Sequence, residues 1–187
     1  MANIETRMNV FHLMRHVAVS KITGDVVELG CAAGESSIVV QKVLNEFAPD
    51  KAFHVFDSFE GLPEIKAEDQ SDNVFKKGDV SVPENILHKN FAETQVSPPH
   101  VHKGWFEDTV PYNLPDKISF AIVDGDLYSS TKHILPHVYE RLSPGAICIF
   151  IVYYNENIFR RDYTDDCQKC PGARRAIDEF FADKPES

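Results

Sequence analysis

The fold is decided by the stretch Asp25-Val26-Val27-Glu28-Leu29-Gly30-Cys31-Ala32-Ala33-Gly34. Its first half is a short, largely apolar and β-branched run that stops at a glycine, which is typical of a buried strand. A helical spacing of apolar residues follows over about residues 36–47. The stretch therefore predicts a strand, a glycine-rich turn and a helix.

The same alternation extends on both sides of this unit. Steps of three and four between apolar residues predict an amphipathic helix over 4–19. Further strands are predicted over 51–56, 101–104, 118–123 and 146–154, and further helices over 83–91, 129–142 and 172–183. A polar loop follows the strand 146–154. Ser129 or Ser130 is the expected N-cap of the helix 129–142.

This alternation predicts the fold class. Parallel strands need long crossovers, which helices supply, so we predict an α/β protein with a Rossmann-like, doubly wound, mostly parallel sheet and helices on both faces. The 187 residues and the 43% hydrophobic fraction suit a single domain over 1–187.

Composition excludes some partners. A net charge of −10 argues against a nucleic-acid partner, because binding a phosphate backbone requires clustered Lys and Arg. No apolar run approaches the ~20 residues that cross a bilayer, and the N-terminus lacks a basic region followed by an apolar stretch. We therefore expect a cytoplasmic protein with no membrane partner.

Only one pair of the four cysteines has a suggestive spacing. Cys167 and Cys170 are separated by two residues, but a zinc site needs four ligands and no second pair is present. We interpret the segment as a polar loop with two thiols, and leave a local disulfide or a partial metal site open.

Acidic residues occupy the carboxyl ends of three predicted strands, namely Glu28, Asp57 and Asp124. In open parallel sheets, ligands bind at this edge. The loop lacks the third glycine of G-x-G-x-x-G, and an anion cradle would not suit Glu28, so a dinucleotide oxidoreductase is disfavoured. Glu28 suits a ligand with a positive end, such as the sulfonium of S-adenosylmethionine, and Asp57 suits its ribose hydroxyls. A helix-capping Glu28 and a turn-forming Asp57 are the structural alternatives.

Several long blocks of sequence point to a family. They are Gly24–Gly30, Gly34–Ser37, Phe56–Pro63, Gly104–Phe106, Asp108–Thr109, Asp124–Thr131 and Pro171–Ala176. Through these blocks the chain resembles, nearly end to end, the macrocin O-methyltransferase family, whose members methylate sugar hydroxyls on macrolides and related products.

The resemblance implies S-adenosylmethionine as the cofactor and assigns its contacts. Its methionine part is expected to lie against Glu28, Gly30 and the turn Gly34–Ser37, which includes Ser36 and Ser37. Cys31, Ala32 and Asp124 are also expected to contact the cofactor. Its ribose is expected at Asp57 and Ser58, and the edge of its adenine pocket at Gly104 and Trp105. Trp105 could instead be a core aromatic residue.

The resemblance also implies Mg²⁺, held by Asp124 and by an Asp-Asp pair that ends the following strand. A hard cation lowers the pKa of a sugar hydroxyl and fixes its position. Counted from Pro144-Gly145, however, the pair falls on Ile151 and Val152, which cannot coordinate a metal. With Asp126, Asn155 or Glu156 as distant substitutes, the sequence favours the absence of bound Mg²⁺.

Two functions follow. The leading hypothesis is methyl transfer from S-adenosylmethionine to a sugar hydroxyl on a natural product or glycan, with Asp124 as base or metal ligand and the loop 60–97 covering the acceptor. The alternative is a cofactor-binding module that has lost catalysis together with its metal site.

The resemblance further implies a final antiparallel part of the sheet beyond the last predicted helix, which we expect this chain to lack. An exposed edge beside the strand 146–154 would then favour self-association into a homo-oligomer.

Overall fold

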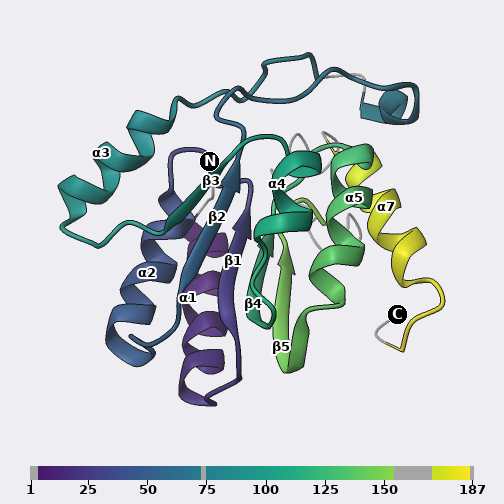
Figure 1. Ribbon diagram of the computed structural model, residues 1–187. Helices are drawn as coiled ribbons and strands as arrows, with labels where there is room; N and C mark the ends of the chain where they lie inside the picture. The colour runs from purple at the N-terminus through teal and green to yellow at the C-terminus, as the bar shows by residue number, and fades with distance from the viewer. Residues whose placement is uncertain (1–3, 73–74, 154–169, 186–187) are drawn as a thin grey trace.

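The computed structural model describes residues 4–72, 75–153 and 170–185 (Figure 1). One sheet of parallel strands has the order β3-β2-β1-β4-β5. The strands are β1 (Asp25–Leu29), β2 (Phe53–Asp57), β3 (His100–Lys103), β4 (Ile118–Val123) and β5 (Leu142–Phe150). The chain moves outward from β1 to β3 and then returns to β4, so the strand order reverses between β1 and β4, where such sheets bind ligands.

Helices cover both faces of the sheet (Figure 1). One apolar cluster joins the sheet to α1 (Ile4–Val19), α2 (Glu35–Phe47) and α3 (Glu84–Thr94). A second cluster joins the other face to α4 (Phe106–Asn113) and α5 (Tyr128–Tyr139), and α7 (Pro171–Phe181) packs against α5. None of the described helices combines the length and the apolar character that crossing a bilayer requires.

The α/β class and the doubly wound sheet are confirmed. The bounds predicted for α1, β1 and β4 agree with the structure, because each is a single uninterrupted pattern. The other predicted bounds differ from the structure by up to four residues. β5 runs from Leu142 to Phe150 instead of over 146–154, α5 ends at Tyr139 instead of 142, and α3 ends at Thr94 instead of 91. The Ser143-Pro144-Gly145 turn signal hid the start of β5, where Leu142 pairs with Ile118 before a shift in register.

Two helical features were missed. The sequence pattern did not predict α4, a short helix of 8 residues with Pro111 inside it. The N-cap expected at Ser129 or Ser130 was also wrong, because the N-cap position is Leu127 and no side chain caps the helix there. A backbone N–H in the first turn of α5, that of Ser129, instead donates to the side chain of Asp69, a residue distant in sequence.

The self-association prediction remains untested. The prediction required an unpaired edge beside the last strand. Within the described part of the chain, β5 pairs only with β4 and lies at an edge of the sheet.

We predict that Met14→Ala lowers the free energy of unfolding by about 2–5 kcal/mol, because Met14 is fully buried and its loss leaves a cavity between α1 and the sheet. Met8, on the same helix, is 52% exposed and provides the control. Met8→Ala should change the same quantity by less than about 0.5 kcal/mol in urea unfolding. Equal effects of the two substitutions would contradict the packing described here.

Candidate functional site

The loop after β1 can pass close to its neighbours only because it contains glycine. Gly30 has φ +91°, and a Cβ there would lie 2.5 Å from the carbonyl oxygen of Asp124. Gly34, at the start of α2, has φ +80°, and its Cβ would meet the end of the Leu87 side chain on α3. At Gly30 the backbone of Asp124 leaves no room for a side chain, and at Gly34 the positive φ disfavours one. The loop therefore lies directly against the carboxyl end of β4.

Glu28 is fully buried beneath this loop. Its two carboxylate oxygens accept hydrogen bonds from the hydroxyls of Ser36 and Ser37 on α2. Burial raises the pKa of Glu28 to about 7; the serine hydrogen bonds oppose this rise, and the charge of Asp57 adds to it. The helix-cap alternative is wrong, because the carboxylate contacts serine hydroxyls and Gly34 occupies the N-cap position of α2 without a side-chain bond.

Asp57, at the end of β2, holds the loop from the other side. Its Oδ2 accepts the backbone N–H of Cys31 at 3.0 Å and of Ala32 at 2.9 Å. Its Oδ1 accepts the backbone N–H of Phe59 at 2.8 Å, so the turn-forming role expected as an alternative is present. The thiol of Cys31 beneath these bonds is buried, and burial raises its pKa, so it stays protonated.

Ser58, Gly104 and Trp105 lie around Asp57, as the sequence predicted for one site. The Ser58 hydroxyl donates to the carbonyl oxygen of Gly61 at 3.0 Å and so shapes the turn after β2. The backbone N–H of Gly104 donates to the carbonyl oxygen of Asp57 at 3.0 Å. Trp105 is half-buried and occupies the N-cap position of α4, which places it at this edge of the sheet.

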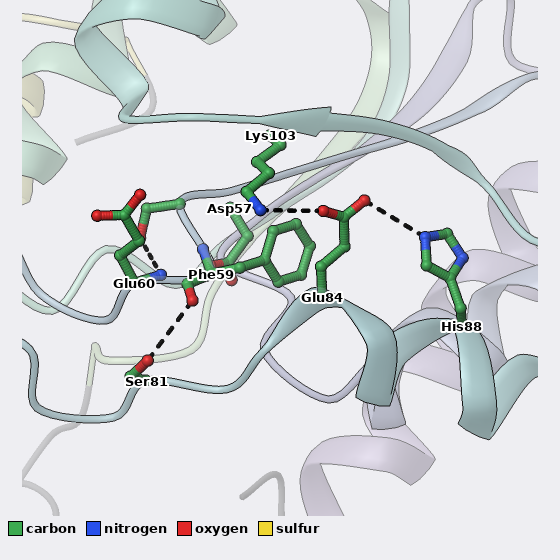
Figure 2. A network of polar contacts seen from close by, with 8 residues as sticks. Asp57, Phe59, Glu60, Ser81, Glu84, His88 and Lys103 are labelled. Carbon is green, nitrogen blue, oxygen red and sulfur yellow. Dashed lines mark hydrogen bonds and ion pairs between the residues drawn. The ribbon is translucent and has the colours of Figure 1, made fainter.

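An ion pair that the sequence analysis missed lies beside Asp57 (Figure 2). Lys103, at the end of β3, lies 3.2 Å from Oε2 of Glu84 on α3, and His88 lies 3.3 Å from Oε1 of the same carboxylate. The hydrogen bond from Lys103 is the main cause that lowers the pKa of Glu84. These contacts fasten α3 to the end of β3. No local signal could have revealed the pair of Lys103 with Glu84, because these partners come from separate elements, whereas Glu84 and His88 are four residues apart on α3.

Asp124 brings a third carboxyl group to this edge. Its backbone N–H donates to the carbonyl oxygen of Leu29 at 2.8 Å, which joins the ends of β4 and β1. Burial, followed by the charges of Asp126, Glu28 and Asp57, raises the pKa of Asp124 well above its usual value. The site therefore concentrates negative charge and would be stabilised by a cation.

The two expected metal-binding positions after β5 are apolar in their contacts as well as in their side chains. The N–H of Ile151 donates to the carbonyl oxygen of Val123 at 3.1 Å, and its side chain packs against the core. Val152 packs against Cys170 and Ala173 of the α7 region.

Within the part of the chain that the structure describes, the donor set therefore does not fit Mg²⁺. Among the described residues, no group of three or more His, Cys, Asp or Glu side chains could hold a metal ion. Asp126 accepts a hydrogen bond from the Cys170 thiol at 3.4 Å. The other expected substitutes, Asn155 and Glu156, and the second thiol of the cysteine pair, Cys167, lie outside the described residues.

Residues 4–184 match the model of a protein family described as Macrocin-O-methyltransferase (TylF). The chain belongs to this family. The expectation drawn from the sequence blocks is thereby confirmed, and the family consists of S-adenosylmethionine-dependent O-methyltransferases.

Named relatives of this macrocin O-methyltransferase family member act on natural products. Demethyldecarbamoylnovobiocin O-methyltransferase of Streptomyces niveus is 28% identical over 190 residues, which cover 97% of this chain and 67% of the relative. The 8-demethyl-8-(2,3-dimethoxy-alpha-L-rhamnosyl)-tetracenomycin-C 4'-O-methyltransferase of Streptomyces olivaceus is 33% identical over 162 residues, covering 82% and 62%. This chain thus spans about two thirds of the length of these relatives.

A solved structure agrees with this assignment. The O-methyltransferase NovP superimposes with a TM-score of 0.81 at 27% identity, over 96% of this chain and 72% of NovP. The fold and the family are therefore supported by independent comparisons of structure and sequence.

We predict that Asp57→Asn destabilises the chain by roughly 1–3 kcal/mol, because an amide NH₂ would replace one of two oxygens that both face backbone N–H donors. Urea unfolding measures the loss. Asp50→Asn, at an exposed position, is the control and should have an effect below about 0.5 kcal/mol. An unchanged stability of the Asp57 variant would show that the carboxylate does not hold the loop.

Proposed function

We propose that this chain binds S-adenosylmethionine at the carboxyl ends of β1, β2 and β4, and transfers its methyl group to a hydroxyl oxygen of a sugar on a natural product or glycan. The observation that carries the proposal is the convergence of three carboxyl groups around a glycine loop, in a chain that belongs to an O-methyltransferase family. Such a site suits a ligand that is positively charged at its reactive sulfur.

The proposed contacts of the cofactor follow the sequence prediction. We assign the methionine part to Glu28 and to the two serines that contact it, with the backbone of the loop 30–34 passing alongside. We assign the ribose hydroxyls to Asp57 and Ser58, and the adenine edge to Gly104 and Trp105. These groups fit the cofactor, because a carboxylate can accept further hydrogen bonds and glycine permits close approach.

We propose Asp124 as the catalytic base. When bound, S-adenosylmethionine supplies a methyl group that is already activated, so the protein mainly aligns the acceptor oxygen with it. The raised pKa of Asp124 makes it a stronger base than an exposed aspartate and suits it to accept the hydroxyl proton. Because the donor set at Ile151 and Val152 does not fit Mg²⁺, no step is assigned to a metal.

A methyl-transfer assay tests this proposal. The chain is incubated with S-adenosylmethionine labelled in the methyl group and with a panel of deoxysugar glycosides, and the transferred label is counted. We expect transfer to at least one glycoside, and a loss of at least about 100-fold in Asp124→Asn, within the range attributed to general base catalysis.

The second candidate function is a module that binds the cofactor without catalysis. The apolar packing of Ile151 and Val152, where the family resemblance implies carboxylates, is the observation that favours it. Binding of S-adenosylmethionine without transfer to any member of the panel would support the module and contradict the enzyme.

We predict that the affinity for S-adenosylmethionine rises between pH 6 and pH 8. The pKa of Glu28 is about 7, so the side chain is mainly neutral at pH 6 and mainly a carboxylate at pH 8, and a cation binds the carboxylate better. S-adenosylhomocysteine has a neutral sulfur, so its affinity should vary less over this range. Isothermal titration calorimetry of both ligands at several pH values measures the difference.

Glu28→Gln should remove this difference in pH dependence between the two ligands. The matched substitution Glu46→Gln, on the exposed side of α2, should preserve it. Identical pH profiles of the two ligands with the unaltered chain would show that Glu28 does not sense the sulfonium charge.

We predict that Mg²⁺ has no effect on the cofactor-loaded chain. With S-adenosylhomocysteine in excess, millimolar Mg²⁺ or a chelator should leave the thermal midpoint within about 1 °C, because a ligand that does not bind the native state does not stabilise it. Ca²⁺ at the same concentration controls for ionic strength. A stabilisation specific to Mg²⁺ would mean that residues outside the described part complete a metal site.

A further inference from the structure

The segment that follows β2 and runs into the 3₁₀ helix η1 (Ala67–Asp72) is fastened at its far end by a buried carboxylate. We call residues 60–69 the strap. Figure 1 shows the strap leaving the end of β2 and passing to the region of α5 and α7, and η1 contacts both helices. Most side chains of the strap are exposed or half-buried, but Asp69 has no exposed surface.

Asp69 binds the first turn of α5 across a large sequence separation. Its Oδ1 accepts the backbone N–H of Ser129 at 2.8 Å, and its Oδ2 accepts the Ser129 hydroxyl at 2.9 Å. Oδ2 also accepts the backbone N–H of Lys66 at 3.0 Å, which closes the strap on itself. Three donors thus satisfy the buried carboxylate, and its charge lies at the N-terminus of α5, where a helix stabilises an anion.

Two further contacts fasten the strap along its length. The guanidinium of Arg175 on α7 donates to the carbonyl oxygen of Glu68 at 2.8 Å, and lies 4.1 Å from the ring centroid of Tyr128. Lys66 pairs with Glu107 on α4 at 3.3 Å, but both side chains are substantially exposed, so this pair contributes little. The buried anchor is therefore Asp69.

The chain itself contains a matched comparison. Asp79 accepts the backbone N–H of Lys76, three residues earlier, at 2.8 Å, as Asp69 does with Lys66. Asp79 is only half-buried, and each of its described side-chain bonds is to this local partner. The connection to α5 is what distinguishes Asp69.

We propose that Asp69 is a positioning residue that fixes the acceptor side of the site. Ser129 follows closely on the loop that carries Asp124 and Asp126, and Thr131 in the same turn donates to the carbonyl oxygen of Gly125 at 2.6 Å. By binding Ser129, Asp69 holds the strap against this loop. The strap then forms one side of the space in which the acceptor binds next to Asp124. The proposal rests on the proposed function, since it assigns the acceptor to Asp124.

The anchor is tested first without any assay of activity. In Asp69→Ala, trypsin should cleave after Lys66 at least tenfold faster, measured by mass spectrometry under native conditions. Hydrogen exchange at the Ser129 amide should also accelerate, because this amide bonds to Asp69. Asp79→Ala should leave both readouts at Lys66 and Ser129 unchanged. Unaltered cleavage and exchange in Asp69→Ala would overturn the proposal.

The positioning role is tested by kinetics with a glycoside that the chain methylates. In Asp69→Ala, KM for the acceptor should rise at least tenfold, while the Kd for S-adenosylmethionine and kcat stay within about twofold. Asp69→Asn keeps Oδ1 for the Ser129 amide but places an NH₂ opposite the Lys66 N–H, so it should raise KM by less than Asp69→Ala does. Asp79→Ala should behave like the unaltered chain. A fall in kcat with unchanged KM would overturn the positioning role.

Failure of the proposed function is distinguishable from failure of this inference. If the unaltered chain methylates no acceptor, the proposed function fails, whereas the proteolysis and exchange results still decide whether Asp69 anchors the strap. If Asp69→Ala does not fold, Ser129→Ala removes only the hydroxyl donor and should accelerate cleavage after Lys66 in the same direction.

Discussion

One aspartate joins the carboxyl ends of three strands. The side chain of Asp57 binds two backbone N–H groups of the loop after β1 and one in the turn after β2, and its own carbonyl oxygen accepts the N–H of Gly104 after β3. The loop between Gly30 and Gly34 has no regular secondary structure that would satisfy those donors. The shape of the loop, and with it the cofactor side of the proposed site, therefore depends on this carboxylate. The turn-forming role of Asp57 is compatible with the ligand-binding role proposed for it.

The second constraint on the site is electrostatic. Glu28 and Asp124 are buried near Asp57. Burial raises the pKa of both groups, and the repulsion between the three carboxylates raises it further. Without a positive ligand, part of this charge is neutralised by protons, at a cost to folding that rises with pH. Such a site is less stable than a neutral one, and the free energy lost in this way is available to a cation that binds there.

Sequence patterns predicted those structural features that are determined by residues adjacent along the chain. The end of β1, the glycines beside it and the acidic residues at the strand ends are local features, and the structure brings them together because parallel strands end at one edge. Counting along the chain also located Ile151 and Val152. The link from Asp69 to Ser129 could not be found in this way, since it replaces a local N-cap by a partner 60 residues away. The ion pair of Glu84 with Lys103 was missed for the same reason.

The strand order also governs how the chain acquires its structure. β1 is central, and β2, which pairs with one of its sides, follows after a single helix, whereas β4, which pairs with the other, begins only at Ile118. During synthesis from the N-terminus, one side of β1 must therefore stay unpaired until the second half of the sheet emerges. An apolar central strand with an open side can pair with other chains, so this topology favours rapid completion of the sheet once β4 has been made.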